Sequence, residues 1–253
     1  MREAASRIDR WYAITLAALL ASCAIEDPDD QDEDSYVDPG ADPSDGKFDT
    51  ASSVDAVARV TCSTVPVLGL SMQIAEELRC LAPGVLVAFE ATGSIKFASA
   101  AVLPYLTAET TEALQAAASA VGGVTINSGF RSLAQQFLLY GWKQQGRCGI
   151  RAAATPGRSN HETARALDLA NSAQAKKAML SHGFTWLSFD PVHFDHLASP
   201  DVRGLGVEAF QRLWNRNHPE DRIAEDGDYG PQTAARVARS PSGGFAISGC
   251  QPK

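Results

Sequence analysis

Two short segments of this chain carry most of its metal-ligating side chains, and the geometry that they require limits how the chain can fold. Residues 159–168 contain His161 and Asp168, and residues 190–195 contain His193. On one continuous helix His161 and Asp168 would lie about 10 Å apart along the axis. Ligands of one ion each lie about 2 Å from it. If both side chains bind one ion, they therefore cannot share a helix.

The local sequence instead favours a turn followed by a strand. Residues 156–160, Pro-Gly-Arg-Ser-Asn, have the composition of a loop. Residues 166–169, Ala-Leu-Asp-Leu, are typical of a short buried strand. A turn and a strand can bring His161 and Asp168 to one point.

The chemistry of these residue types indicates a zinc hydrolase. His161, Asp168 and His193 would supply two imidazoles and a carboxylate to one Zn²⁺ and leave a fourth position for water. Asp190, three residues before His193, would accept a proton from that water as the general base. Asp195 and Glu162 are the alternative bases.

The same segments resemble a known family. Residues 159–168 are similar to the pattern Ser-x-His-x-x-Gly-x-Ala-x-Asp, residues 190–194 to Glu/Asp-Pro-x-His-Phe, and residues 128–132 to Ser-Gly-Tyr/Phe-Arg-Ser. In this order they resemble the zinc D-alanyl-D-alanine peptidases, which include the VanY-like vancomycin-resistance carboxypeptidases, the related dipeptidases and L-alanyl-D-glutamate endopeptidases. The resemblance covers roughly residues 106–200.

The resemblance implies the same ligands and base, and it adds residues that contact the substrate. Arg131 would polarise the scissile carbonyl or hold a substrate carboxylate, and Ser128 and Ser159 would bind substrate. Ala164 stands where the family has glycine, which would cost about 1 kcal/mol or more if this position needs a positive φ. Val192 stands where tryptophan is common.

The resemblance also implies a substrate, namely the stem peptides of peptidoglycan, and favours a D-alanyl-D-alanine carboxypeptidase. A non-catalytic peptidoglycan-binding lipoprotein is one alternative, favoured if Ala164 distorts the site. A zinc amidase or an L-alanyl-D-glutamate endopeptidase on the same scaffold is another, because pocket walls rather than metal ligands select the bond.

The first 23 residues are predicted to be a lipoprotein signal peptide. Three arginines precede an apolar run over residues 11–20, which is too short to span a bilayer but suits a signal-peptide core. The run ends in Leu-Ala-Ser-Cys, which resembles a bacterial lipobox with Cys23 as the lipidated residue. We expect a cell-envelope lipoprotein on the periplasmic or outer-surface side of a bacterial membrane, and a plain secretory signal is the alternative.

The net negative charge of the chain comes from the segment that follows the predicted signal peptide. Residues 26–49 hold eleven acidic residues and one lysine, so residues 24–50 are predicted to be a disordered tether. Residues 50–253 hold 18 Lys plus Arg against 17 Asp plus Glu, a net charge of +1. No basic patch with interleaved aromatic residues stands out, so we expect no nucleic-acid partner. We expect a monomer.

The cysteine pattern predicts two disulfides. With Cys23 assigned to the lipid, four cysteines remain in an exported chain, which favours disulfides. Of the three possible pairings we favour Cys62–Cys80, which closes a local loop, with Cys148–Cys250, which would hold the C-terminal tail on the catalytic body. A four-cysteine zinc site is less attractive because no Cys-x-x-Cys pair occurs.

The remaining pattern predicts an α+β fold in which a small antiparallel sheet carries the zinc site and helices flank it. The expected helices cover residues 108–121, a segment from the capping box at Ser132 through Gln145, and a segment capped by Ser172 and ended by Gly183. Besides 166–169, the expected strands cover 124–127 and 184–189.

A short helical appendage is expected after the catalytic domain. Residues 209–215 form an amphipathic helical segment, and Pro231 begins a second helix. Residues 226–233 resemble the Asp-Gly-x-Phe/Tyr-Gly-Pro-x-Thr core of peptidoglycan-binding modules, although the match is shorter than a complete module, so a packing subdomain is the alternative. The predicted divisions are 1–23 signal peptide, 24–50 tether, 51–203 catalytic domain, 204–240 peptidoglycan-binding-like segment and 241–253 tail.

Overall fold

The computed structural model describes residues 52–249. The signal peptide, Cys23, the tether and Cys250 lie outside the described residues. The elements run in the order α1 (Val54–Val60), η2 (Val65–Val67), α2 (Leu68–Leu81), β1 (Leu86–Ala88), β2 (Ile95–Phe97), β3 (Tyr105–Thr107), α3 (Ala108–Val121), β4 (Val124–Ser128), α4 (Leu133–Gln144), η3 (Asn160–Thr163), β5 (Ala166–Leu169), α5 (Ser172–Ser181), β6 (Thr185–Trp186), β7 (His193–Asp195), α6 (Arg203–Asn217) and α7 (Pro231–Arg239).

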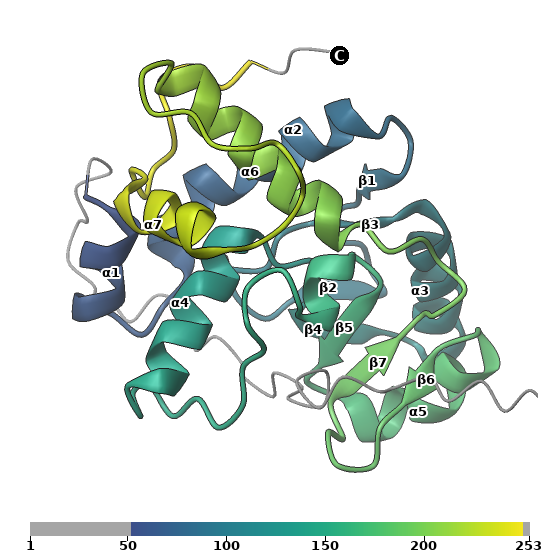
Figure 1. The fold of residues 1–253 in the computed structure, drawn as a ribbon. Helices are drawn as coiled ribbons and strands as arrows, with labels where there is room; N and C mark the ends of the chain where they lie inside the picture. Colours follow the sequence, from purple (N-terminus) through teal and green to yellow (C-terminus); the bar gives the residue numbers. More distant parts are fainter. Residues whose placement is uncertain (1–51, 250–253) are drawn as a thin grey trace, which may run out of the picture.

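The predicted α+β class is confirmed, and the elements form two packed halves (Figure 1). In one half, α1, α2, α4, α6 and α7 enclose one apolar core. In the other, α3 and α5 cover the sheet and bury a second apolar core against it. No helix of the described segment is long and apolar enough to cross a membrane.

The main sheet has the strand order β2-β4-β5-β7-β6. Three of its four pairings are antiparallel, as predicted, and the pairing of β2 with β4 is parallel. The sequence did not predict β2, because a strand of three residues is too short to show a periodicity. A separate two-stranded sheet joins β1 to β3.

Local capping signals place the helices that flank the sheet. The Thr107 side chain accepts a hydrogen bond from the Thr110 amide, and Gly122 ends α3 in the left-handed region at φ 79°. Ser132 and Gln135 form the predicted capping box at the start of α4. These helices therefore begin and end close to where the sequence predicts.

Two local predictions were less accurate. Asn171 rather than Ser172 is the N-cap residue of α5, and its side chain instead bonds the backbone of residues 123 and 125. The strand expected over residues 184–189 is reduced to Thr185 and Trp186. Bends at residues 188–189 and a turn at residues 191–192 take up the rest of the segment before β7.

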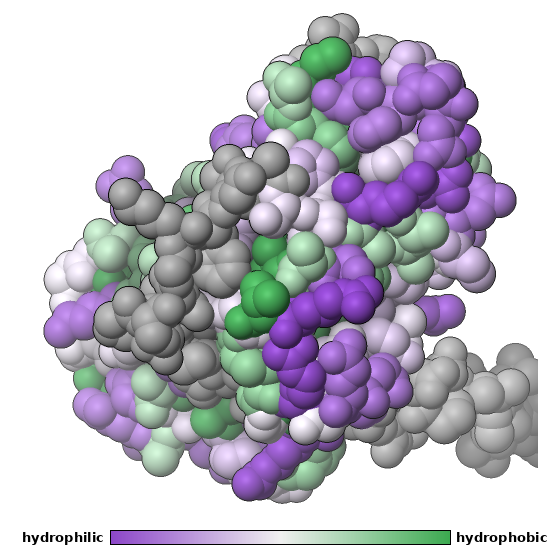
Figure 2. All heavy atoms as spheres, turned by 90° about the vertical axis from the view of Figure 1, so that its left-hand side faces the viewer, coloured by the Kyte–Doolittle hydropathy of each residue, from purple (hydrophilic) through white to green (hydrophobic). Residues whose placement is uncertain are grey.

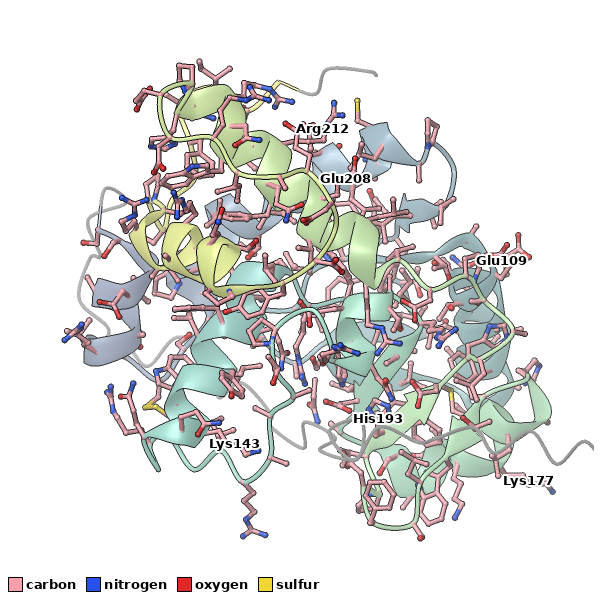
Figure 3. All side chains as sticks on the ribbon, in the orientation of Figure 1. Glu109, Lys143, Lys177, His193, Glu208 and Arg212 are labelled. Atoms are coloured by element: carbon pink, nitrogen blue, oxygen red, sulfur yellow. A yellow bond between two sulfur atoms is a disulfide. The ribbon has the colours of Figure 1, made fainter. Side chains whose placement is uncertain are left out.

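The two C-terminal helices are helical as predicted, and they pack into the first core rather than standing apart. Phe210, Leu213 and Val237 are fully buried there. Glu77 of α2 is almost fully buried and accepts hydrogen bonds at 2.8 Å from Arg212 and Arg216 of α6. Figure 3 labels Arg212 on the side of α6 that faces α2. These contacts join α6 to the N-terminal helices.

The predicted disulfide pairing is wrong, because Cys62 is bonded to Cys148. This excludes both Cys62–Cys80 and Cys148–Cys250. Cys80 is also disulfide-bonded. The prediction favoured Cys62–Cys80 because these two cysteines are close in sequence. Cys62 and Cys148 are 86 residues apart in the chain, but the fold brings their Cα atoms to 5.3 Å.

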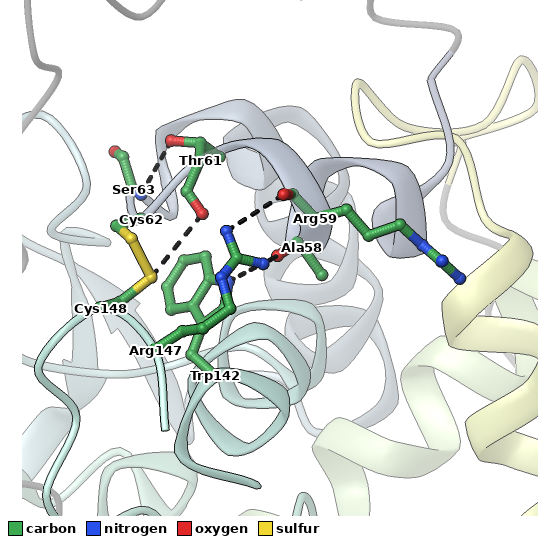
Figure 4. Close-up of a disulfide and its surroundings, with 8 residues drawn as sticks. All are labelled: Ala58, Arg59, Thr61, Cys62, Ser63, Trp142, Arg147 and Cys148. Carbon is green, nitrogen blue, oxygen red and sulfur yellow. Dashed lines mark hydrogen bonds between the residues drawn. A yellow bond between two sulfur atoms is a disulfide. The ribbon is translucent and has the colours of Figure 1, made fainter. Parts of the chain in front are cut away.

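The bridge lies where the C-terminal end of α1 meets the C-terminal end of α4 (Figure 4). Trp142 Nε1 and Arg147 Nη1 each donate a hydrogen bond of 2.8 Å to the carbonyl oxygen of Ala58. Arg147 Nη2 donates to the carbonyl of Arg59. These bonds satisfy carbonyl groups that the end of α1 leaves without helical partners.

The molecular surface mixes polar and apolar residues. On the face shown in Figure 2, hydrophilic residues surround small hydrophobic areas. Val60, Phe189 and Leu197 are among the exposed large apolar residues. Single exposed apolar residues are ordinary for folded proteins.

Candidate metal centre

The loop before β5 positions His161. Ser159 caps the short η3 helix, and its hydroxyl accepts a hydrogen bond from the His161 amide. The Glu162 carboxylate accepts hydrogen bonds from the amides of Gly157 and Ser159. This capping box fixes the loop that carries His161, so Ser159 and Glu162 stabilise the conformation of the loop. Substrate binding by Ser159 stays a prediction.

Strand pairing positions the other two candidate ligands. β5 and β7 are antiparallel, and Asp168 lies directly opposite His193 in their register. Ser128 of β4 is the partner of Asp168 on the other side. Ser128, Asp168 and His193 therefore lie side by side on the three adjacent strands β4, β5 and β7. Figure 3 labels His193 in this region.

A tight turn positions Asp190 relative to His193. The His193 amide donates a hydrogen bond to the Asp190 carbonyl at 3.2 Å, which closes a four-residue turn. Pro191 occupies the second position of this turn, where its fixed φ is favoured. The turn places the candidate base and the last candidate ligand at its two ends.

The three predicted ligands meet in one buried cluster. One ligand atom each from His161, Asp168 and His193 all lie within 4.8 Å of one another. His161 Nε2 is 3.3 Å from Asp168 Oδ2, and His193 Nδ1 is 3.1 Å from Asp168 Oδ1. All three side chains are fully buried.

This cluster fits a zinc ion. Two imidazoles and one carboxylate are a common zinc donor set. His161 Nδ1 lies 2.9 Å from the Gly129 carbonyl, a contact that fixes the ring and turns Nε2 toward Asp168. In the part of the chain that the structure describes, no hydrogen bond reaches this buried Nε2. A bound cation would satisfy it.

Opposite charges shift the pKa values in the cluster. Burial disfavours the charged form of Asp168, but the imidazoles of His161 and His193 outweigh burial and hold the pKa of Asp168 below its usual range. Burial also disfavours charged His193, but Asp168 and Asp195 hold the pKa of His193 well above its usual range. A bound metal would take the place of the proton on His193.

Asp190 has the environment of a base. Its side chain is almost fully buried, and within residues 52–249 neither carboxylate oxygen makes a well-formed hydrogen bond. Burial and the negative charge of Asp168 raise the pKa of Asp190, while His193 and the Val192 amide oppose the shift. A raised pKa makes a carboxylate a better proton acceptor near neutral pH.

Arg131 lies inside the cluster rather than at its rim. Its Nη2 donates to Asp168 Oδ2 at 3.1 Å, and its Nε donates to Ser128 Oγ at 2.8 Å. A small pocket adjoins both residues, with Asn127 and Gln135 also in its wall. Arg131 therefore orients a candidate ligand, and its predicted contact with substrate stays a prediction, as does that of Ser128.

Ala164 adopts the conformation that favours the family glycine. Its φ is 59° and its ψ is 23°, in the left-handed region, and its side chain is fully buried. An L-residue pays about 1–2 kcal/mol for this conformation. The site nevertheless assembles around it, because the Ala164 amide bonds the His161 carbonyl and its carbonyl accepts from Thr107.

The sequence did not single out the contact between Asp195 and His193. Asp195 Oδ2 lies 3.1 Å from His193 Nε2. The two residues are two apart on β7, so the period of a strand places them on one face. That spacing is the signal that could have linked them.

A search against family models finds one family over this region. The model of VanY, D-alanyl-D-alanine carboxypeptidase, matches residues 102–197. These residues include β4, η3, β5 and β7, which hold the whole cluster. No curated protein matches the chain.

The fold places a buried cluster of histidine and aspartate side chains that could hold a metal ion on a small sheet, inside the segment that matches a peptidase family. The part of the chain that holds this site belongs to the VanY-like family.

Proposed function

We propose that this protein is a zinc D-alanyl-D-alanine carboxypeptidase that shortens the stem peptides of peptidoglycan. The observation that carries the proposal is the buried cluster of His161, Asp168 and His193 inside the VanY-like segment. The buried carboxylate of Asp190, one turn away in the chain, adds the base that a hydrolase needs.

His161, Asp168 and His193 would hold the zinc ion. When bound, zinc would supply a Lewis acid that makes water more acidic and stabilises negative charge on the scissile carbonyl. The fixed ring of His161 and the paired strands that carry Asp168 and His193 keep these side chains in place before metal binding. Such preorganisation lowers the cost of binding.

Asp190 would carry the proton through the reaction. It would accept a proton from the attacking water and pass one to the amine that leaves as D-alanine. The carboxylate is suited to this role because it has few hydrogen bonds to break and a raised pKa. Water adds across the amide bond, so the products are a shortened peptide with a new carboxylate and free D-alanine.

Arg131 would act on charge near the reacting bond. Its guanidinium is buried beside Asp168 and next to the pocket that also includes Ser128. A fixed cation in a buried site stabilises negative charge that develops on a carbonyl oxygen. The same cation can pair with the terminal carboxylate that a carboxypeptidase substrate carries.

A specific observation disfavours the non-catalytic alternative. Distortion of the site by Ala164 would favour that alternative, yet the candidate ligand atoms lie within 4.8 Å of one another with Ala164 in the left-handed region. The choice between a carboxypeptidase and an L-alanyl-D-glutamate endopeptidase depends on the peptide bond that fits the pocket.

Cleavage of defined muropeptides tests the proposal. Purified protein with bound zinc is incubated with pentapeptide muropeptides, and the products are identified by mass spectrometry. Release of one terminal alanine supports a carboxypeptidase, and a cut between L-alanine and D-glutamate assigns the endopeptidase instead. An intact substrate with zinc bound would contradict peptidase activity on stem peptides.

We also propose that lipidation of Cys23 attaches the protein to the membrane, where stem peptides are within reach, and that it has no nucleic-acid partner. The apolar run before Cys23 and the near-neutral charge of residues 50–253 support this. Cys23→Ser should abolish lipid labelling and release the protein from membranes. Membrane attachment of this variant would indicate a retained anchor instead.

A further inference from the structure

We infer that Tyr229 is a positioning residue for His161, because its side chain supports the backbone of the loop that carries this candidate ligand. Tyr229 lies between α6 and α7, outside the residues 102–197 that match the family model. The inference rests on the metal centre proposed above and assigns a role to a residue outside its ligand set. Tyr229 itself would not contact the ion or the substrate.

The close approach of Tyr229 to Gly157 carries this inference. Gly157 precedes His161 by four residues and has a φ of 82°, a conformation that favours glycine. A Cβ atom added at this position would lie 2.9 Å from Tyr229 Cβ and 3.4 Å from Val207 Cγ2, and the first distance is shorter than real Cβ contacts. The backbone of the loop therefore lies directly against these two side chains.

Hydrogen bonds connect Gly157 to His161. The Gly157 amide donates to Glu162 Oε2 at 2.8 Å, and the same oxygen accepts from the Ser159 amide at 3.2 Å. Ser159 Oγ in turn accepts from the His161 amide at 3.3 Å. A displacement of Gly157 would therefore disturb the capping box that fixes the backbone of His161.

A buried side chain of α6 holds Tyr229 in place. Gln211 is 1% exposed; its Oε1 accepts from the Gly227 amide at 3.0 Å, and its Nε2 donates to the Asp228 carbonyl at 3.1 Å. Asp226 Oδ1 accepts from the Asp228 amide at 3.0 Å. Tyr229 then packs, partly buried, against the first apolar core. Because its neighbours in the chain are fixed to α6, Tyr229 offers the loop a firm support.

The start of α6 contacts the same loop at two further points. Arg203 Nη1 donates to the Arg158 carbonyl at 3.0 Å. The amide of Val202, the N-cap residue of α6, donates to the Thr163 carbonyl at 3.4 Å. Arg158 and Thr163 lie on either side of His161 in the sequence. The C-terminal part of the chain therefore holds the loop both before and after the candidate ligand.

His161 depends on such support more than the other two candidate ligands. Asp168 and His193 lie on paired strands, whereas His161 lies on the short η3 helix within a loop. Metal sites require their ligands to be held within about 0.5 Å of the working geometry, and loops open locally more readily than paired strands. Residues 226–233, which resemble part of a peptidoglycan-binding motif, would thus belong to the catalytic unit.

Hydrogen–deuterium exchange of the metal-free protein tests the support directly. Exchange of the peptide over residues 155–165 is compared in wild type, Tyr229→Ala, Tyr229→Phe and the control Phe245→Ala. Phe245 packs on Trp214 in the same apolar core. We expect Tyr229→Ala to speed this exchange by about tenfold or more. Tyr229→Phe keeps the carbon atoms that face Gly157 and should match wild type, and Phe245→Ala should lower the unfolding free energy without this local effect.

Zinc affinity of the same variants shows whether the support acts on His161. Dissociation constants are measured by competition with a chromophoric chelator. We expect Tyr229→Ala to weaken zinc binding by about tenfold, while Tyr229→Phe and Phe245→Ala keep the wild-type affinity. The absorption spectrum of the Co²⁺-substituted protein reports the ligand geometry and should change in Tyr229→Ala alone, which a general loss of stability would not produce.

The outcomes separate the inference from the proposed metal centre. Wild-type exchange over residues 155–165 in folded Tyr229→Ala overturns the inference, and so does equal acceleration in Phe245→Ala. Faster exchange with unchanged zinc affinity also overturns it, because the loop would then not position His161. If Tyr229→Ala does not fold, Val207→Ala removes the second side chain that supports the loop, and unchanged exchange in that variant overturns the inference. If wild type binds no zinc, the metal centre itself is contradicted, and exchange still decides whether Tyr229 supports the loop.

Discussion

His193 Nδ1 lies 3.1 Å from Asp168 Oδ1 across two paired strands, and the two residues are direct partners in the β5–β7 register. A shift of this register by one residue would turn one of the two side chains to the opposite face of the sheet. The geometry of the candidate site is therefore tied to the pairing of the sheet. Changes to single side chains of the cluster should alter chemistry more than fold.

Removal of one candidate ligand should remove the metal. Wild type should bind about one Zn²⁺ per chain, and His161→Ala should lose it because two remaining ligands hold zinc poorly. The measurement is zinc content by atomic emission after dialysis. His182→Ala, a histidine outside the cluster on the C-terminal cap of α5, is the matched control and should keep its zinc. Unchanged zinc content in His161→Ala would contradict the assignment of His161 as a zinc ligand.

Asp190→Asn should separate base chemistry from metal binding. Asparagine keeps the shape of the side chain but cannot accept the proton, so kcat should fall by about 10² or more while zinc content stays unchanged. Metal content and stem-peptide cleavage are measured on the same preparation. Loss of zinc would make Asp190 a ligand, and near-normal kcat would assign the base to another carboxylate.

Ala164→Gly should change little, although it relieves a strained backbone. Glycine removes about 1–2 kcal/mol of left-handed strain, but it adds up to about 1 kcal/mol of unfolded-chain entropy and loses a buried methyl worth about 0.8 kcal/mol. We therefore expect the unfolding free energy to change by less than about 1 kcal/mol. Urea denaturation and zinc titration check this. A zinc affinity more than about tenfold tighter would show that Ala164 does distort the site.

The Cys62–Cys148 bridge should contribute strongly to stability because it closes a long loop. The two cysteines are 86 residues apart in sequence. A disulfide that closes so long a loop typically raises the unfolding free energy by about 2–5 kcal/mol, because it lowers the conformational entropy of the unfolded chain. The double variant Cys62→Ala/Cys148→Ala should lose unfolding free energy of this size in urea denaturation. Mass spectrometry of non-reduced digests should find the peptides around Cys62 and Cys148 joined, and any other partner for Cys62 contradicts the fold in this region.

Tyr229 should make stability depend on alkaline pH. Burial raises its pKa well above the usual range, and the negative charge of Glu162 adds to the shift. The neutral phenol thus favours the folded state, with its full contribution below the unfolded pKa of about 10. This contribution is lost as the pH rises from there through the higher folded pKa.

Replacement of Tyr229 checks this dependence. Tyr229→Phe cannot ionise, so its unfolding free energy should fall less steeply than that of wild type between about pH 10 and pH 11. Below about pH 9 the two proteins should differ by a constant amount. Curves that stay parallel through the alkaline range would contradict the burial of this phenol.

The sequence by itself determined the features that depend on near neighbours. The caps at Thr107 and Ser132 and the left-handed residue at Gly122 act within one helical turn, so the pattern of residues predicts them directly. The motifs also predicted that His161, Asp168 and His193 lie close together, as the structure shows, whereas the role of Asp190 stays a prediction. The strand around Asp168 was predicted from its short apolar run.

Only the tertiary structure decided the contacts between distant segments. The Cys62–Cys148 bridge, the bond from Arg131 to Asp168 and the parallel pairing of β2 join residues far apart in the chain. Such contacts depend on strand register and on how helices cross, which no local pattern encodes. The sequence therefore named the chemical groups of the site, and packing decided which atom of each group faces the next.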